Sequence, residues 1–137
     1  MNGILQRIGS ILITLGGLLL LGSAAAKLVR VPRVVAELGT MGFDGHKLTF
    51  IALLEVASAV LFLVPFTRSA GLLLVSSFMG GAIATHLQHE PFQSIVGPSA
   101  VLALIWLGAA LRHREVLWGV QPVTGATDRG AIAKETR

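Results

Sequence analysis

The sequence predicts an all-α integral membrane protein, a four-helix bundle with a short interfacial helix between its first and second spans. Three observations carry this prediction. The first is composition, since 53% of its 137 residues are hydrophobic and only 13% are charged. The second is a mean hydropathy of +0.77. A soluble domain usually has about a quarter charged residues, so this chain has too few to cover a surface in contact with water. The third observation is four apolar blocks of membrane-spanning length.

The four blocks lie at about 8–26, 48–66, 69–87 and 95–111. At 1.5 Å per residue, each is of about the length needed to cross a roughly 30 Å hydrocarbon core. They must be helices, because an open sheet would leave backbone groups unpaired in lipid. The fourth block contains Pro98 in its first turn, where the missing N–H costs little.

The first block has an alternative interpretation as a cleavable signal peptide. A basic residue precedes it, and the small residues Ser23 to Ala26 close it. Its length, greater than that of the usual signal-peptide core, favours a membrane span.

The four blocks belong to a four-span domain over residues 1–116, and a tail over 117–137 follows it. Residues 32–38 begin with a proline and are followed by Gly39, which predicts a short helix in the membrane interface. Arg30 and Arg33 are expected to contact lipid phosphates there. The tail is polar and without apolar periodicity.

The distribution of basic residues predicts cytoplasmic termini. Seven Lys and Arg fall on the side of the termini and four on the other side. The seven are Arg7, Arg68, Arg112, Arg114, Arg129, Lys134 and Arg137, and the four are Lys27, Arg30, Arg33 and Lys47.

Four polar residues within or beside the spans are the candidate functional residues. Because successive spans reverse direction, Lys27, Glu55, His86 and His89 should meet in one half of the bundle. An ionised carboxylate at Glu55 costs about 2.5 to 3.5 kcal/mol in the membrane, so it needs a partner or a proton. Its neighbours one turn away include Ala52 and Ala59, a small-residue face that should point into the bundle.

Several roles remain open for these residues. Lys27 either forms an ion pair with Glu55 or extends to the lipid phosphates. His86 and His89 are either neutral imidazoles bonded to backbone or water, or parts of a proton relay or ligand contact with Glu55. No metal site is predicted, because the two histidines lack a clear third ligand. With no cysteine, thiolate ligands and disulfides are excluded.

Small residues recur at four-residue spacing along the third block. Such stripes allow helices to approach closely, although the spacing does not say whether the neighbour is in the same chain. The stripes are Ser76, Gly80 and Ala84, and in parallel Ser77, Gly81 and Thr85.

The chain resembles the DoxX-like family of small four-span bacterial membrane proteins over about residues 5–115. The resemblance rests on four segments: Gly22 to Leu28, ending span one with Lys27; Glu37-Leu38-Gly39; Ile51 to Glu55; and Ala84-Thr85-His86-Leu87. It implies a location in the bacterial inner membrane and places the family's recurrent polar residues on Lys27, Glu55 and His86. Some relatives are linked to membrane redox systems, including a thiosulfate:quinone oxidoreductase subunit and an assembly with superoxide dismutase and a sulfurtransferase.

The sequence and the resemblance together favour a non-catalytic subunit or scaffold of a membrane complex, and the relatives named above make a redox complex the candidate. The main alternative is a site for quinone or another lipid-like molecule that uses Glu55 and His86, and transport of an ion or small solute ranks below both. No resident cofactor is predicted, with quinone as the candidate ligand. The expected partners are the lipid bilayer and other membrane subunits or further copies of the chain, and not nucleic acid, because the basic residues flank apolar blocks.

Overall fold

The computed structural model describes residues 2–112, so the expected tail at 117–137 and the basic residues beyond Arg112 lie outside the described residues. Within this range the chain is helical and has no strand. The elements are α1 (Asn2–Leu28), α2 (Pro32–Thr40), α3 (Gly45–Leu63), α4 (Arg68–His89), the 3₁₀ turn η1 (Phe92–Ile95) and α5 (Val96–Arg112).

Four segments are long and apolar enough to cross a membrane: Gly3–Leu28, Gly45–Leu63, Arg68–His89 and Phe92–Arg112. Many of their large apolar side chains face outward, as expected for helices surrounded by lipid. Examples are Ile11, Leu18, Phe50, Leu53, Leu73 and Leu107. The prediction of an all-α membrane bundle is therefore confirmed.

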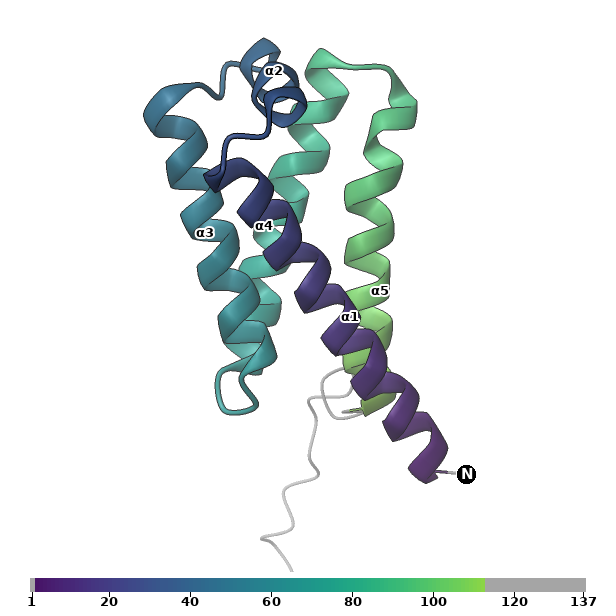
Figure 1. Cartoon of the computed structure of the whole chain (residues 1–137). Coiled ribbons are helices and arrows are strands. Elements are labelled where there is room, and N and C mark those ends of the chain that lie inside the picture. The colour runs from purple at the N-terminus through teal and green to yellow at the C-terminus, as the bar shows by residue number, and fades with distance from the viewer. Residues whose placement is uncertain (1, 113–137) are drawn as a thin grey trace, which may run out of the picture.

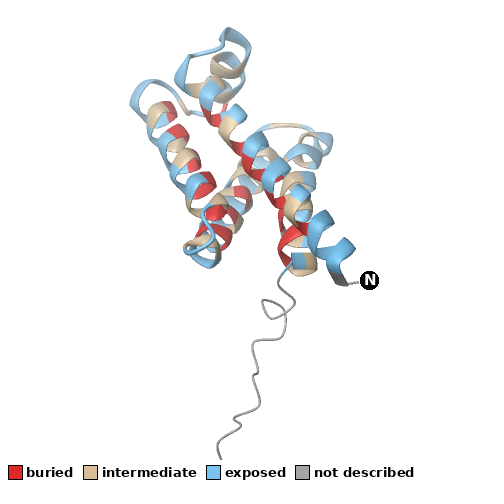
Figure 2. Ribbon diagram, turned by 60° about the horizontal axis from the view of Figure 1, so that its bottom comes forward, coloured by how far each residue is buried: buried red, intermediate tan, exposed pale blue. Residues whose placement is uncertain are grey.

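The four long helices form a closed ring of neighbours (Figure 1). Helix α1 crosses the bundle diagonally and packs against both α3 and α5, while α4 packs against α3 and, less extensively, α5. Buried residues line the faces that the helices turn toward each other (Figure 2). The core consists of Ile13, Leu20, Ala59, Phe62, Leu72, Val75, Met79, Ile105 and Ala109.

Helix α2 lies at the end of the bundle opposite the N-terminus (Figure 1). It begins at Pro32, as expected, but Gly39 lies inside it and the helix continues to Thr40. Gly42, with a φ of +83°, ends the helix instead. The Phe43 N–H bonds to the Leu38 carbonyl at 2.9 Å and the Gly42 N–H to that of Gly39 at 3.0 Å, which is the Schellman arrangement.

Helix α3 also ends earlier than the apolar block at 48–66 predicts. Val64 is extended because it precedes Pro65, whose ring disfavours helical backbone at the preceding residue. The apolar residues from 64 to 66 belong to the turn into α4. Arg68 donates hydrogen bonds to the Phe62 and Leu63 carbonyls and so satisfies the end of α3.

Close helix contacts occur at glycines, but not at those of the predicted stripes. A Cβ atom added at Gly9 would lie 2.8 Å from the Arg112 backbone nitrogen, and one at Gly108 would lie 2.9 Å from the Leu12 Cβ. At Gly71 an added Cβ would meet the backbone of Phe62. These three glycines bring α1 against α5 and α4 against α3.

Gly80 and Gly81, by contrast, meet no atom within 4 Å among the described residues. Ser77 and Ala84 are exposed beside them. Within this chain the two glycines are therefore not helix contacts, and packing against a second chain stays a prediction. Ser76 does reach a neighbouring helix, since the Trp106 indole N–H of α5 donates to its hydroxyl at 3.0 Å.

Candidate functional site

A cavity of about 650 Å³ occupies the half of the bundle nearest α2. Its volume is in the range of small-molecule sites, and its wall is mainly apolar with a few polar groups, as in such sites. All four long helices and α2 contribute to it. The polar or ionisable side chains in the wall are those of Ser23, Lys27, Glu37, Glu55, Ser77, Thr85 and His86.

Lys27 and Glu55 form an ion pair in this wall. The Lys27 Nζ donates to Glu55 Oε2 at 2.7 Å and to the Ser23 hydroxyl at 2.6 Å. Lys27 lies in the last turn of α1 and Glu55 in the middle of α3, so the pair joins two spans. In the structure Lys27 therefore forms the ion pair with Glu55 and does not extend to the lipid phosphates.

Glu55 faces the bundle, as its small neighbours predict. Its side chain is only 2% exposed, and Ala52, Ser58 and Ala59 on the same face are buried as well. Glu55 therefore lies in the interior of the bundle, where an unpaired charge would destabilise the fold. Among the described residues, every side-chain nitrogen or oxygen atom that has no accessible surface of its own has a hydrogen-bond partner.

The ion pair has hydrogen-bonding capacity left over. An ammonium group has three N–H donors, and Lys27 uses two of them in the bonds to Ser23 and Glu55. The second carboxylate oxygen, Glu55 Oε1, accepts no hydrogen bond from the described residues. A molecule in the cavity could therefore meet one donor and one acceptor side by side.

His86 lines the same cavity but has a different partner. Its Nδ1 lies 2.9 Å from Glu90 Oε2. A side-chain hydrogen bond with Ser94, and after it the one with His86, holds the pKa of the Glu90 carboxyl below its usual value. Glu37 of α2 approaches the same two side chains, and the ligand-type atoms of Glu37, His86 and Glu90 lie within 4.8 Å of one another.

His89 and the two interfacial arginines lie outside this site. His89 is exposed, is absent from the cavity wall, and places its Nδ1 3.0 Å from the Thr85 carbonyl. The structure thus brings Lys27, Glu55 and His86 to the cavity wall but not His89, which lies about one helical turn beyond His86 and is exposed. Arg30 and Arg33 are exposed at the same end of the bundle, which leaves their expected contact with lipid phosphates a prediction.

Sequence reasoning missed two residues of the site, Glu37 and Glu90. Glu90 lies four positions after His86, a spacing that places two side chains of one helix side by side, so its pairing could have been anticipated. Glu37 gives no such signal, since it meets His86 only through the placement of α2 over the end of α4.

Comparison with known protein families identifies the family of this chain. The model of the DoxX-like family matches residues 11–108. The chain belongs to the DoxX-like family. The match spans most of the four-helix bundle and includes both the ion pair and the cluster of Glu37, His86 and Glu90.

Searches among curated proteins and solved structures returned no match for this DoxX-like chain. The family therefore establishes a small multi-pass membrane protein, and any more specific role is argued from the site.

Proposed function

We propose that this DoxX-like protein binds a quinone or a similar lipid-like molecule in the cavity, with the polar head of that molecule against Lys27 and Glu55. The observation that carries the proposal is the ion pair in the wall of a mainly apolar 650 Å³ cavity. Apolar walls suit a hydrocarbon tail, and a few convergent polar groups suit an oxygenated head.

The hydrogen bonds left over at the ion pair match quinone chemistry. A quinone oxygen accepts a hydrogen bond, which the third N–H of Lys27 can donate. A quinol hydroxyl donates one, which Glu55 Oε1 can accept. The pair can thus hold either redox form of the head group, and Glu55 is placed to take or give a proton.

A titration of the purified full chain in detergent with a short-chain quinone tests this proposal. Glu55→Gln keeps the shape of the side chain but removes its charge and replaces one oxygen with a donor. Loss of a hydrogen bond to a charged group should weaken binding by about 10- to 100-fold. Arg33→Gln, at an exposed position outside the cavity wall, is the matched control and should bind as the parent chain does.

The second candidate is a non-catalytic subunit whose buried charges only fix how its helices pack. The link that the Lys27–Glu55 pair makes between α1 and α3 favours it. This role predicts a stoichiometric protein partner after purification from native membranes and no saturable quinone binding. Native mass spectrometry of that assembly distinguishes the two roles, because it detects bound proteins and bound lipid-like molecules together.

A further inference from the structure

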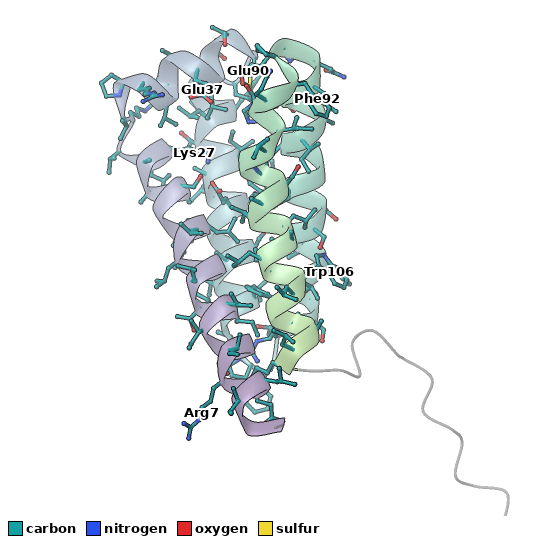
Figure 3. The ribbon with its side chains drawn as sticks, turned by 90° about the vertical axis from the view of Figure 1, so that its right-hand side faces the viewer. Arg7, Lys27, Glu37, Glu90, Phe92 and Trp106 are labelled. Atoms are coloured by element: carbon teal, nitrogen blue, oxygen red, sulfur yellow. The ribbon has the colours of Figure 1, made fainter. Side chains whose placement is uncertain are left out.

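Three side chains from two separate helical segments converge where α2 passes over the end of α4. Glu37 comes from α2, His86 from the last turn of α4, and Glu90 from the residue after that helix. Figure 3 shows Glu37 and Glu90 together at this end of the bundle, beyond Lys27. The geometry brings Glu37 to two residues, His86 and Glu90, that lie far from it in the sequence but close to each other.

The chemistry of these groups is that of a divalent metal site. An imidazole nitrogen and carboxylate oxygens are common ligands of Zn²⁺, which binds them at about 2.0 to 2.2 Å in a tetrahedral arrangement. Such bonds hold ligand atoms roughly 3.4 Å apart. The atoms here lie within 4.8 Å of one another, and Glu37 is exposed on a short helix, so a small side-chain movement would complete the set.

The charge of the cluster also favours a cation. Two carboxylates approach the same imidazole, and like charges at this distance repel each other. Within the cluster only His86 can offset them, and it carries at most one positive charge. A divalent ion would balance both carboxylates with the imidazole neutral, which is the form that binds metal.

Two of the three groups are already held in position. The Glu90 backbone N–H bonds to the His86 carbonyl at 2.9 Å, which fixes the two residues beside each other. Their side chains also face each other, since His86 Nδ1 lies 2.9 Å from Glu90 Oε2.

We propose that Glu37, His86 and Glu90 bind one divalent transition-metal ion of the Zn²⁺ type at the rim of the cavity. Glu37 and His86 line the cavity, whereas Glu90 is not part of its wall. With three protein ligands, a tetrahedral ion would have one position free for a ligand in the adjoining cavity. The site would therefore present a Lewis acid to an oxygen-bearing ligand and would also tie α2 to α4.

Titration of Zn²⁺ into the full chain, purified in detergent without a histidine tag, tests the metal site. One equivalent should bind saturably. Replacement of a residue hydrogen-bonded to a ligand costs about 10- to 100-fold in metal affinity, so loss of a ligand should cost at least about tenfold. This loss is expected for His86→Ala and for Glu37→Gln, the latter at an exposed position where the fold is not at risk.

His89→Ala is the matched control, because this histidine lies one turn away on the same helix and outside the cluster. Its Zn²⁺ affinity should stay within about twofold of the parent value, well inside the tenfold effect of losing a ligand. Absence of saturable binding, unchanged affinity in Glu37→Gln, or an equal loss in His89→Ala would each overturn the proposal. The titration contains no quinone, and the quinone titration can be run with a chelator, so each proposal fails or stands separately.

Discussion

The Lys27 ammonium of α1 donates a 2.7 Å hydrogen bond to the Glu55 carboxylate of α3, across 28 positions of sequence. This bond accounts for how a membrane span tolerates an acidic residue at its centre: the charge is paired, turned inward and placed on the wall of a cavity. It connects the fold to the proposed function, because the same two groups hold α1 to α3 and offer hydrogen bonds to a ligand.

Removal of Lys27 should leave a buried carboxylate without its partner. Breaking a buried pair in this way costs about 3 to 5 kcal/mol, and we expect Lys27→Met to lower the free energy of unfolding by about 3 kcal/mol, since Lys27 borders the cavity. The double variant Lys27→Met/Glu55→Leu should recover most of this loss. Equilibrium unfolding in mixed detergent micelles measures both, and a double variant no more stable than the single one would show that the pair is not coupled.

Gly71 should be intolerant of any side chain, unlike the glycines of the predicted stripes. Gly71→Ala places a methyl group against the Phe62 backbone, and such overpacking costs about 1 to 3 kcal/mol. Gly80→Ala, on the same helix but in open space, should be neutral or stabilising by up to about 1 kcal/mol. Thermal unfolding of the two variants compares them directly, and equal stabilities would contradict the packing of α3 against α4 described here.

The stripes show what spacing alone can and cannot predict. Four-residue spacing places small residues on one face of α4, but the sequence does not specify which helix lies against that face. In the structure α4 meets α3 through Gly71, which lies outside the stripes, and α5 through Ser76, the first residue of one stripe, while Gly80 and Gly81 stay open within the described chain.

The Trp106 hydrogen bond to Ser76 should contribute to the contact between α4 and α5. A double-mutant cycle of Trp106→Phe and Ser76→Ala should give a coupling energy of about 1 kcal/mol, the usual net value of a neutral hydrogen bond. The cycle removes the effect of the smaller ring, which is common to both variants that carry Phe. Additive single effects would mean that the bond contributes nothing to stability.

Much of the fold follows from the sequence because lipid imposes so few solutions. Apolar blocks of this length must be helices, and four of them must alternate in direction, which already places Lys27, Glu55 and His86 in the same half of the bundle. The helix ends were less predictable. Local backbone rules at Pro65 and Gly42, rather than apolar content, end α3 and α2.

The part of the site that depends on the cost of burying a charge was predictable from the sequence. The part that depends on where α2 lies in the folded chain was not. Burial of Glu55 requires a partner or a proton, and Lys27 at the end of the first span was one of the partners that the sequence offered. The approach of Glu37 to His86 depends on how α2 lies over the bundle, which no periodicity in residues 32–40 encodes.

The central claim, that the cavity holds a lipid-like ligand, is tested most directly by filling it. Gly81 lines the cavity and meets no atom within 4 Å, so Gly81→Leu should place a side chain in that space without disturbing the helices. Gly80→Leu adds the same side chain at the adjacent open position, which is not part of the cavity wall. Calorimetric titration with a short-chain quinone should show affinity lowered at least about tenfold, or 1.4 kcal/mol, in Gly81→Leu and unchanged in Gly80→Leu. Equal affinities in the two variants, or no saturable binding to the parent chain, would contradict the account.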